Sequence, residues 1–181
     1  NSTVRVSDHW SLFGQGEMRL WKVASDLNET LFRFGGHYDI NPKAMVGLGY
    51  VRVDTWPFED GGGRLREENR LYQQFDFKQA WARVKFGHRV RLEQRWFTRN
   101  DGDSYSNRVR YKLGATIPLN YETVRPGAYF IKVLNETFIN FKSGESEFDQ
   151  NRFVVAGGHQ FTPTSNFQLG LLWQKRSSED F

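Results

Sequence analysis

The residues best suited to chemistry in this sequence are basic side chains at alternate positions in two segments. In an extended chain, residues two apart point to the same face. We therefore expect one charged face along each of two neighbouring strands. Rings of Arg and Lys attract anions in membrane pores, whereas paired charges fill narrow barrels, and we favour the second role. This charged ladder comprises Arg83, Lys85, Arg89, Arg91, Glu93, Arg95, Arg108, Arg110 and Lys112.

Groups that could serve catalysis or metal binding are sparse. No histidine shows zinc-ligand spacing with another histidine or with a carboxylate pair. Ser104, Asp103 and His37 could form a hydrolase-like set, but nothing in their spacing requires it. The glycine run 61–63 lacks the Lys-Ser/Thr and the helix of a phosphate loop. We predict no catalytic residues, no metal site and no cofactor. The four histidines are His9, His37, His88 and His159.

Composition narrows the class of protein further. The chain has 181 residues, enough for one domain with its own core, and we treat 1–181 as a single domain. It has no cysteine, which excludes disulfides and thiol chemistry. The net charge is +4, but the basic excess is concentrated in a few segments, so we expect no nucleic-acid partner. No run of about 18 apolar residues occurs, which excludes a transmembrane helix but not a membrane β-barrel, whose strands alternate.

Alternation of apolar and polar residues runs through the chain and predicts ten strands. Many strands reach ten residues or more, whereas strands of soluble proteins average about five or six and tilted membrane strands need about 9–11. The predicted ranges are 1–6, 10–21, 30–39, 44–53, 69–78, 81–97, 108–117, 128–138, 152–161 and 167–174.

The predicted connections alternate in length. Short turns at one rim and long loops at the other are typical of outer-membrane barrels. The short turns fall near Ser7, Asn41, Gln79 and Thr164, and the longer polar loops near Ala24, Gly61, Gly102 and Gly144. Only the predicted connection 119–126 does not fit this alternation.

A soluble barrel has its apolar face inside, whereas a membrane barrel has its apolar face outside, so the direction of the apolar face distinguishes the two. The apolar stripes here end in aromatic residues, which favour membrane–water interfaces. We therefore predict an all-β fold, an antiparallel up-and-down transmembrane β-barrel with a wet, net-positive interior. The expected aromatic girdle is Trp10, Tyr38, Tyr50, Trp96, Phe161 and Trp173. Buried cations need partners, and those available are Glu17, Asp76, Glu93 and Glu136.

Several segments also carry a family resemblance. They are 70–74 (RLYQQ), 88–96 (HRVRLEQRW), 108–113 (RVRYKL), 135–138 (NETF) and 148–152 (FDQNR). On these motifs the chain resembles the bacterial outer-membrane barrels grouped as domain of unknown function 2490. The resemblance implies a barrel in the outer membrane of a Gram-negative bacterium, and it implies no activity. Such proteins usually end with one more amphipathic strand, so we expect 10–12 strands in the complete barrel and a missing terminal strand here.

Four functions stay open at this point. We favour a structural or accessory outer-membrane protein, a subunit of a larger membrane assembly. Its partners would be outer-membrane lipid, lipopolysaccharide and other outer-membrane proteins. The alternatives are a narrow, porin-like channel lined by Arg and Lys, a lipid-modifying enzyme at the rim, and a soluble binding barrel.

Overall fold

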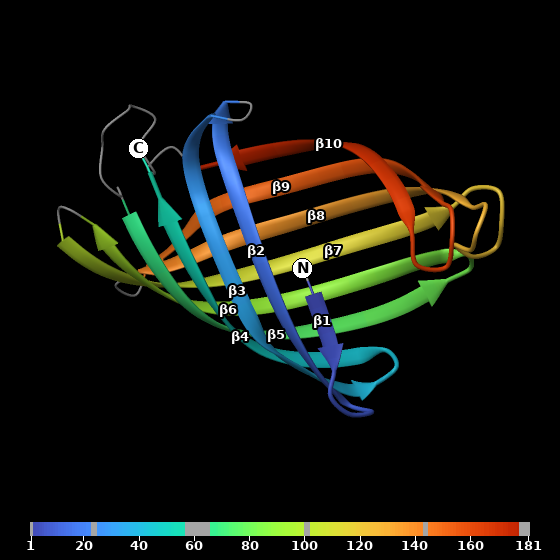
Figure 1. Ribbon diagram of the computed structural model, residues 1–181, viewed down its shortest axis with the longest axis horizontal. Helices are drawn as coiled ribbons and strands as arrows, with labels where there is room; N and C mark the ends of the chain where they lie inside the picture. The colour runs from blue at the N-terminus through green and yellow to red at the C-terminus, as the bar shows by residue number, and fades with distance from the viewer. Residues whose placement is uncertain (1, 23–24, 57–65, 100–101, 143–144, 178–181) are drawn as a thin grey trace. The chain divides into compact units, whose positions relative to one another are not determined.

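The computed structural model describes residues 2–22, 25–56, 66–99, 102–142 and 145–177 (Figure 1). Within these ranges the chain forms strands and no helix, and hence no helix able to cross a membrane. The strands are β1 (Ser2–Arg5), β2 (Trp10–Lys22), β3 (Ser25–Asn41), β4 (Ala44–Thr55), β5 (Arg66–Trp81), β6 (Val84–Arg99), β7 (Gly102–Pro118), β8 (Tyr129–Lys142), β9 (Glu145–Gln160) and β10 (Asn166–Arg176).

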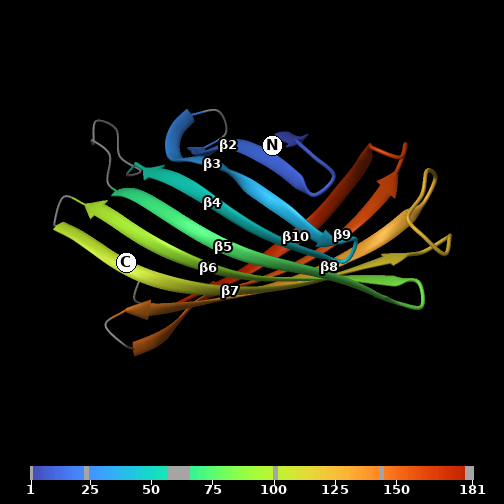
Figure 2. The same ribbon diagram turned by 90° about the horizontal axis from the view of Figure 1, so that it is seen from below.

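The strands pair in chain order in one sheet, from β1 at one end to β10 at the other. Neighbours are antiparallel, so the chain runs up and down. β2, β3 and β4 lie side by side in both views (Figures 1 and 2). Asn41 closes the β3–β4 turn, because its side-chain oxygen accepts hydrogen bonds from the backbone N–H groups of Lys43 and Ala44. The predicted all-β, antiparallel up-and-down arrangement of ten strands is confirmed.

The predicted alternation of short turns and long loops is wrong. The polar segments 25–28, 102–107 and 145–150 belong to β3, β7 and β9, and only two residues separate β6 from β7 and β8 from β9. A neighbouring strand satisfies the backbone of these segments, and this pairing overrides the turn preference of their Asp, Ser and Asn residues. The longest connection in the described part is 119–128, between β7 and β8. The loop predicted at Gly61 lies outside the described residues.

The turn predicted near Gln79 lies a few residues further along the chain. β5 continues to Trp81, and the chain reverses at Ala82 and Arg83. Ala82 has a φ of 49°, the left-handed conformation that tight two-residue hairpins require. Alternation alone does not reveal this position, because alanine is an uncommon residue at positive φ.

The two faces of strands such as β4 to β7 differ in burial, whereas both faces of β1 and β10 are largely exposed. In β6, Arg91, Glu93 and Arg95 are 4%, 1% and 8% exposed, whereas Leu92 and Trp96 between them are 46% and 45% exposed. We call the side carrying the buried charges the polar face and the opposite side the apolar face. This is the reverse of a water-soluble sheet, where the polar side is exposed. The apolar face includes Leu12, Met18, Phe32, Phe34, Leu48, Leu71, Phe75, Leu113, Phe153, Leu169 and Leu171.

Glycines on the polar face make room for aromatic rings. A Cβ at Gly49 would lie 2.5 Å from the hydroxyl oxygen of Tyr72, and one at Gly158 would overlap the ring of Phe130. Tyr72 also packs with Val51 and Val53 in a small core. The polar face is thus closely packed as well as charged.

Candidate functional site

Contacts divide the chain into two compact units, which we describe separately. The first comprises Asn1–Phe75, Arg91–Arg108 and Phe141–Glu145, and the second Asp76–Val90, Val109–Asn140 and Ser146–Phe181. In both units the residues most able to do chemistry are the charged side chains of the polar face.

Glu68 is the centre of one ion-pair network in the first unit. It is fully buried near the start of β5. Its Oε1 accepts hydrogen bonds from the Nε of Arg70 at 2.5 Å and from the Nε of Arg95 at 2.6 Å, and its Oε2 accepts one from the Nη2 of Arg70 at 2.7 Å. Charge-assisted hydrogen bonds of this kind are stronger than neutral ones. One carboxylate therefore ties β5 to β6 and neutralises part of two buried cations.

Glu93 is the centre of a second network in the same unit. Its Oε2 accepts hydrogen bonds from the Nε and Nη2 of Arg108, at 2.8 and 2.6 Å. The Nη1 of Arg91 lies 3.7 Å from the other carboxylate oxygen, and its Nη2 donates to Gln74 at 2.6 Å. The guanidinium of Arg91 also lies 4.2 Å from the ring centroid of Tyr72. The network thereby joins β5, β6 and β7.

The second unit repeats the pattern with fewer charges. Arg110 donates to Glu136 at 2.8 Å, and Arg89 donates to Asp76 at 2.8 Å. The guanidinium groups of Arg110 and Arg152 both lie over the ring of Phe138, at 4.5 and 5.0 Å from its centroid. Asp76, Glu93 and Glu136, three of the expected acidic partners, thus pair with members of the charged ladder. The fourth, Glu17, pairs with Arg19.

The ladder residues do not share one environment. Arg91, Glu93, Arg95 and Arg108 are buried, and Arg89, Arg110 and Lys112 are partly buried. Arg83 lies in the β5–β6 turn and Lys85 at the start of β6, and both are exposed. The central residues of the charged ladder are therefore buried, whereas Arg83 and Lys85 are exposed.

The sequence interpretation missed Glu68, because we assigned it to a loop. The signal that could have found it is the continuation of the β5 alternation toward the N-terminus, where Arg66, Glu68 and Arg70 are spaced as in the ladder. Phe97 was also missed, although three guanidinium groups lie within 6 Å of its ring centroid.

The six expected girdle residues lie on the apolar side and are exposed or partly exposed. Each contacts another ring, as in the pair of Trp10 with Tyr38 at 5.0 Å and that of Trp96 with Tyr105 at 5.4 Å between centroids. The remaining pairs are Tyr50 with Phe34, Phe161 with His159, and Trp173 with Phe153.

The histidines make local contacts. His37 stacks on Phe13 at 4.5 Å, and its Nε2 lies 3.4 Å from the amide nitrogen of Gln74. The two ring nitrogens of His88 lie 3.0 Å from Gln79 Nε2 and 2.9 Å from the hydroxyl of Tyr111. Among the described residues, no group of three or more His, Asp or Glu side chains is placed to hold a metal ion.

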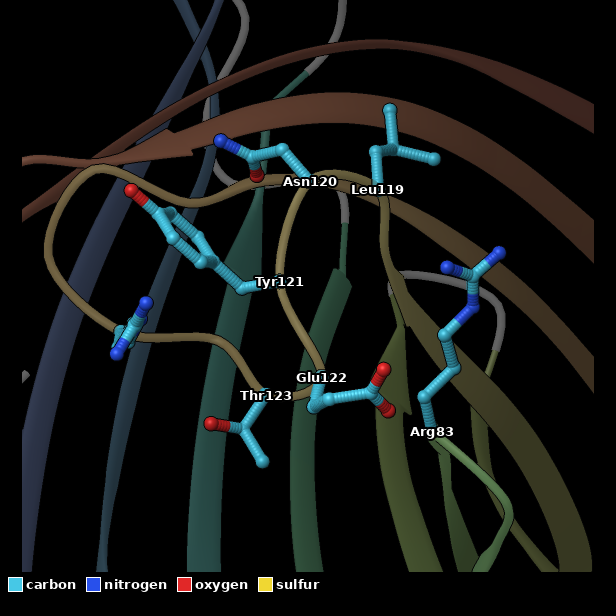
Figure 3. A pocket seen from close by; sticks show the side chains of 7 residues that line it. Arg83, Leu119, Asn120, Tyr121, Glu122 and Thr123 are labelled. Atoms are coloured by element: carbon cyan, nitrogen blue, oxygen red, sulfur yellow. The ribbon is translucent and has the colours of Figure 1, made fainter.

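A polar pocket of about 410 Å³ lies in the second unit, between the β5–β6 turn and the β7–β8 connection (Figure 3). Arg125 covers the ring of Tyr121, with its guanidinium carbon 3.9 Å from the centroid. Asn120 shapes the connection by donating to the carbonyl of Gly127 and accepting from the N–H of Tyr129. The lining residues are Arg83, Leu119, Asn120, Tyr121, Glu122, Thr123 and Arg125.

Comparison with known proteins identifies the family of this chain. No curated protein and no solved structure matches the chain significantly. The sequence model of a family described as protein of unknown function (DUF2490) matches residues 1–180, nearly the whole chain. The protein is therefore a member of the DUF2490 family.

Proposed function

We propose that this protein is a transmembrane β-barrel of the bacterial outer membrane with a structural or accessory role, a subunit of a larger membrane assembly. Its interior would be the polar face, filled by paired charges and aromatic rings. Its apolar face would contact lipid, lipopolysaccharide and neighbouring outer-membrane proteins. The proposal assigns it no catalytic step.

The observation that carries this proposal is the inverted burial of the strands. Phe34 and Leu48 are 60% and 54% exposed, while Glu68 is fully buried. A protein surrounded by water loses stability on both counts, because apolar area stays in water and charges leave it. Against lipid the same arrangement is favourable, since outer-membrane strands alternate apolar-out and polar-in.

Closure of the sheet is part of the proposal. β1 and β10 stand at the two ends of the strand order. In a lipid environment each unpaired backbone group costs several kcal/mol, so spanning sheets close on themselves. Closure would pair these end strands and leave no edge.

The accessory role is favoured over conduction by the packing of the polar face. Arg91, Arg95 and Arg108 are buried and ion-paired. An open water-filled lumen would leave its lining charges exposed to solvent. A barrel of about this strand number is narrow enough for side chains to fill it.

The membrane location is tested by fractionation of cells that produce the protein. We expect it to stay with the outer membrane after washes with high salt and to be released only by detergent. Release by salt alone would contradict the barrel and favour a soluble protein.

The filled interior is tested by recording currents across a planar bilayer containing the purified protein. We expect no steady conductance from correctly inserted protein. A second outer-membrane protein should copurify after extraction in a mild detergent, and a strictly monomeric particle would count against the accessory role.

The surplus of cations on the polar face favours a second candidate, a narrow anion-attracting channel. If a steady anion-selective current appears, charge reversal by Arg91→Glu and Arg110→Glu should shift the reversal potential in a salt gradient. Unchanged selectivity in both variants would exclude the channel.

A further inference from the structure

Three guanidinium groups surround one buried ring where β5 begins and β6 ends. Arg66 is the first residue of β5 and Arg99 the last residue of β6. The guanidinium carbons of Arg66, Arg95 and Arg99 lie 5.7, 4.6 and 5.4 Å from the ring centroid of Phe97. Because all three lie over one ring, they form a compact group of cations on the polar face. We call Arg66, Arg95 and Arg99 the guanidinium cluster.

Among the residues that the structure describes, the carboxylates beside this cluster are already occupied. Glu68 binds Arg95 together with Arg70, and Glu93 binds Arg108 and approaches Arg91. Glu29 interacts electrostatically with Arg66 but is ion-paired with Arg19. Cations outnumber these acids among the described residues of this part of the polar face. The cations are Arg66, Arg70, Arg91, Arg95, Arg99 and Arg108.

The cluster also has an unused donor and a solvent-exposed member. The Nε of Arg66 is buried without a hydrogen-bond partner in the described structure. Such a donor costs stability unless something satisfies it. Arg99 is exposed, whereas Phe97 is 6% exposed. The cluster thus presents one guanidinium to solvent and keeps one buried, unsatisfied donor.

We propose that the guanidinium cluster binds a phosphate-bearing anion. The planar fork of each guanidinium matches two phosphate oxygens, and several forks can share the oxygens of one group. A doubly charged phosphate also offsets the excess of positive charge better than a carboxylate does. The Phe97 ring holds the forks in place through cation–π contacts and lowers the ordering cost of binding. The inference rests on the proposed function only in treating the protein as a detergent-solubilised barrel.

The test is calorimetric titration of the purified full chain in detergent, first with inorganic phosphate and then with mixed micelles of diphosphorylated lipid A. We expect saturable binding of at least one of these probes. The double variant Arg66→Gln, Arg99→Gln should weaken it by about tenfold or more, because each removes a charge-assisted contact. Arg125→Gln is the matched control, since Arg125 is likewise an exposed arginine stacked on an aromatic ring, and it should leave the affinity unchanged.

Folding of each variant is checked by the migration of unheated protein on gels. If the double variant misfolds, Arg99→Gln alone decides the matter, because an exposed residue at a strand end tolerates substitution. Tighter binding of lipid A than of its dephosphorylated form identifies a lipid headgroup, and binding of inorganic phosphate alone identifies a soluble anion.

Absence of saturable binding to both probes, or equal affinity in wild type and variant, overturns the proposal. The bilayer recording is independent of this outcome. A conducting barrel would refute the filled interior and leave the binding result standing, and failure to bind would leave a silent barrel unaffected.

Discussion

Replacing Glu68 with glutamine tests whether the buried ion pairs hold the sheet together. The substitution preserves the shape of the side chain but removes its charge. Glu68 accepts three hydrogen bonds from Arg70 and Arg95, and its side chain is fully buried. Removing one partner of a buried ion pair leaves the other charge uncompensated and costs about 3–5 kcal/mol. We expect Glu68→Gln to lower the free energy of unfolding by that amount.

The neighbouring residue supplies a matched control. Glu67 lies on the opposite face of β5, where its carboxylate pairs with Arg52. Arg52 also pairs with Asp54 at 3.0 Å, so its charge stays compensated when Glu67 is neutralised, and the loss should be smaller. The same chemical change at adjacent positions should therefore have very different effects.

The assay is equilibrium unfolding in lipid vesicles with increasing denaturant, followed by tryptophan fluorescence and extrapolated to zero denaturant. The double variant Glu68→Gln, Arg95→Gln should recover part of the loss, because one of the two cations left uncompensated is gone, with a coupling energy of about 1–3 kcal/mol. The reasoning is refuted if Glu68→Gln costs no more than Glu67→Gln, or if the double variant loses the sum of the two single losses.

Three further predictions address packing, the lipid-facing surface and the aromatic ring. Gly49→Val should lower the thermal midpoint strongly, because overpacking costs about 1–3 kcal/mol or more. Gly14→Val should not lower it, because nothing lies within 4 Å of an added Cβ. Equal midpoints in the two variants would contradict the packing. Leu92→Arg should lower the free energy of unfolding in vesicles by about 2–4 kcal/mol if its face contacts lipid. Leu119→Arg is the control and should cost little, because Leu119 lies outside the strands. Small losses in both variants would argue against membrane insertion. Phe97→Leu should lower the free energy of unfolding by about 1–3 kcal/mol, because it removes the ring shared by three guanidinium groups. The loss is measured by denaturant titration. A variant as stable as the wild type would rule out a cation–π role for this ring.

Much of the fold is readable in the sequence because β-strands have a side-chain period of two. The alternation through Arg91, Leu92 and Glu93 predicts a strand whatever surrounds it. Ten such segments in chain order predict ten antiparallel strands. The acidic partners Asp76, Glu93 and Glu136 could likewise be named in advance, because the cations of neighbouring strands need carboxylates.

The positions of the turns could not be read in the same way. Residues 102–107 are rich in Asp, Ser and Asn, which prefer turns when considered alone. They nevertheless belong to β7, because pairing with a neighbouring strand satisfies their backbone groups. Local preference is a weak guide wherever such a partner is present.

Taken by itself, the sequence determined that ten strands follow one another in chain order, and how their side chains group into a charged face and an apolar face. Only the tertiary structure decided which face is buried, since a period of two is the same whichever side faces inward. It also decided that Glu68 meets Arg95 and that three arginines share the ring of Phe97. These contacts depend on the register between strands, and register is set by pairing across the sheet, which no single strand encodes.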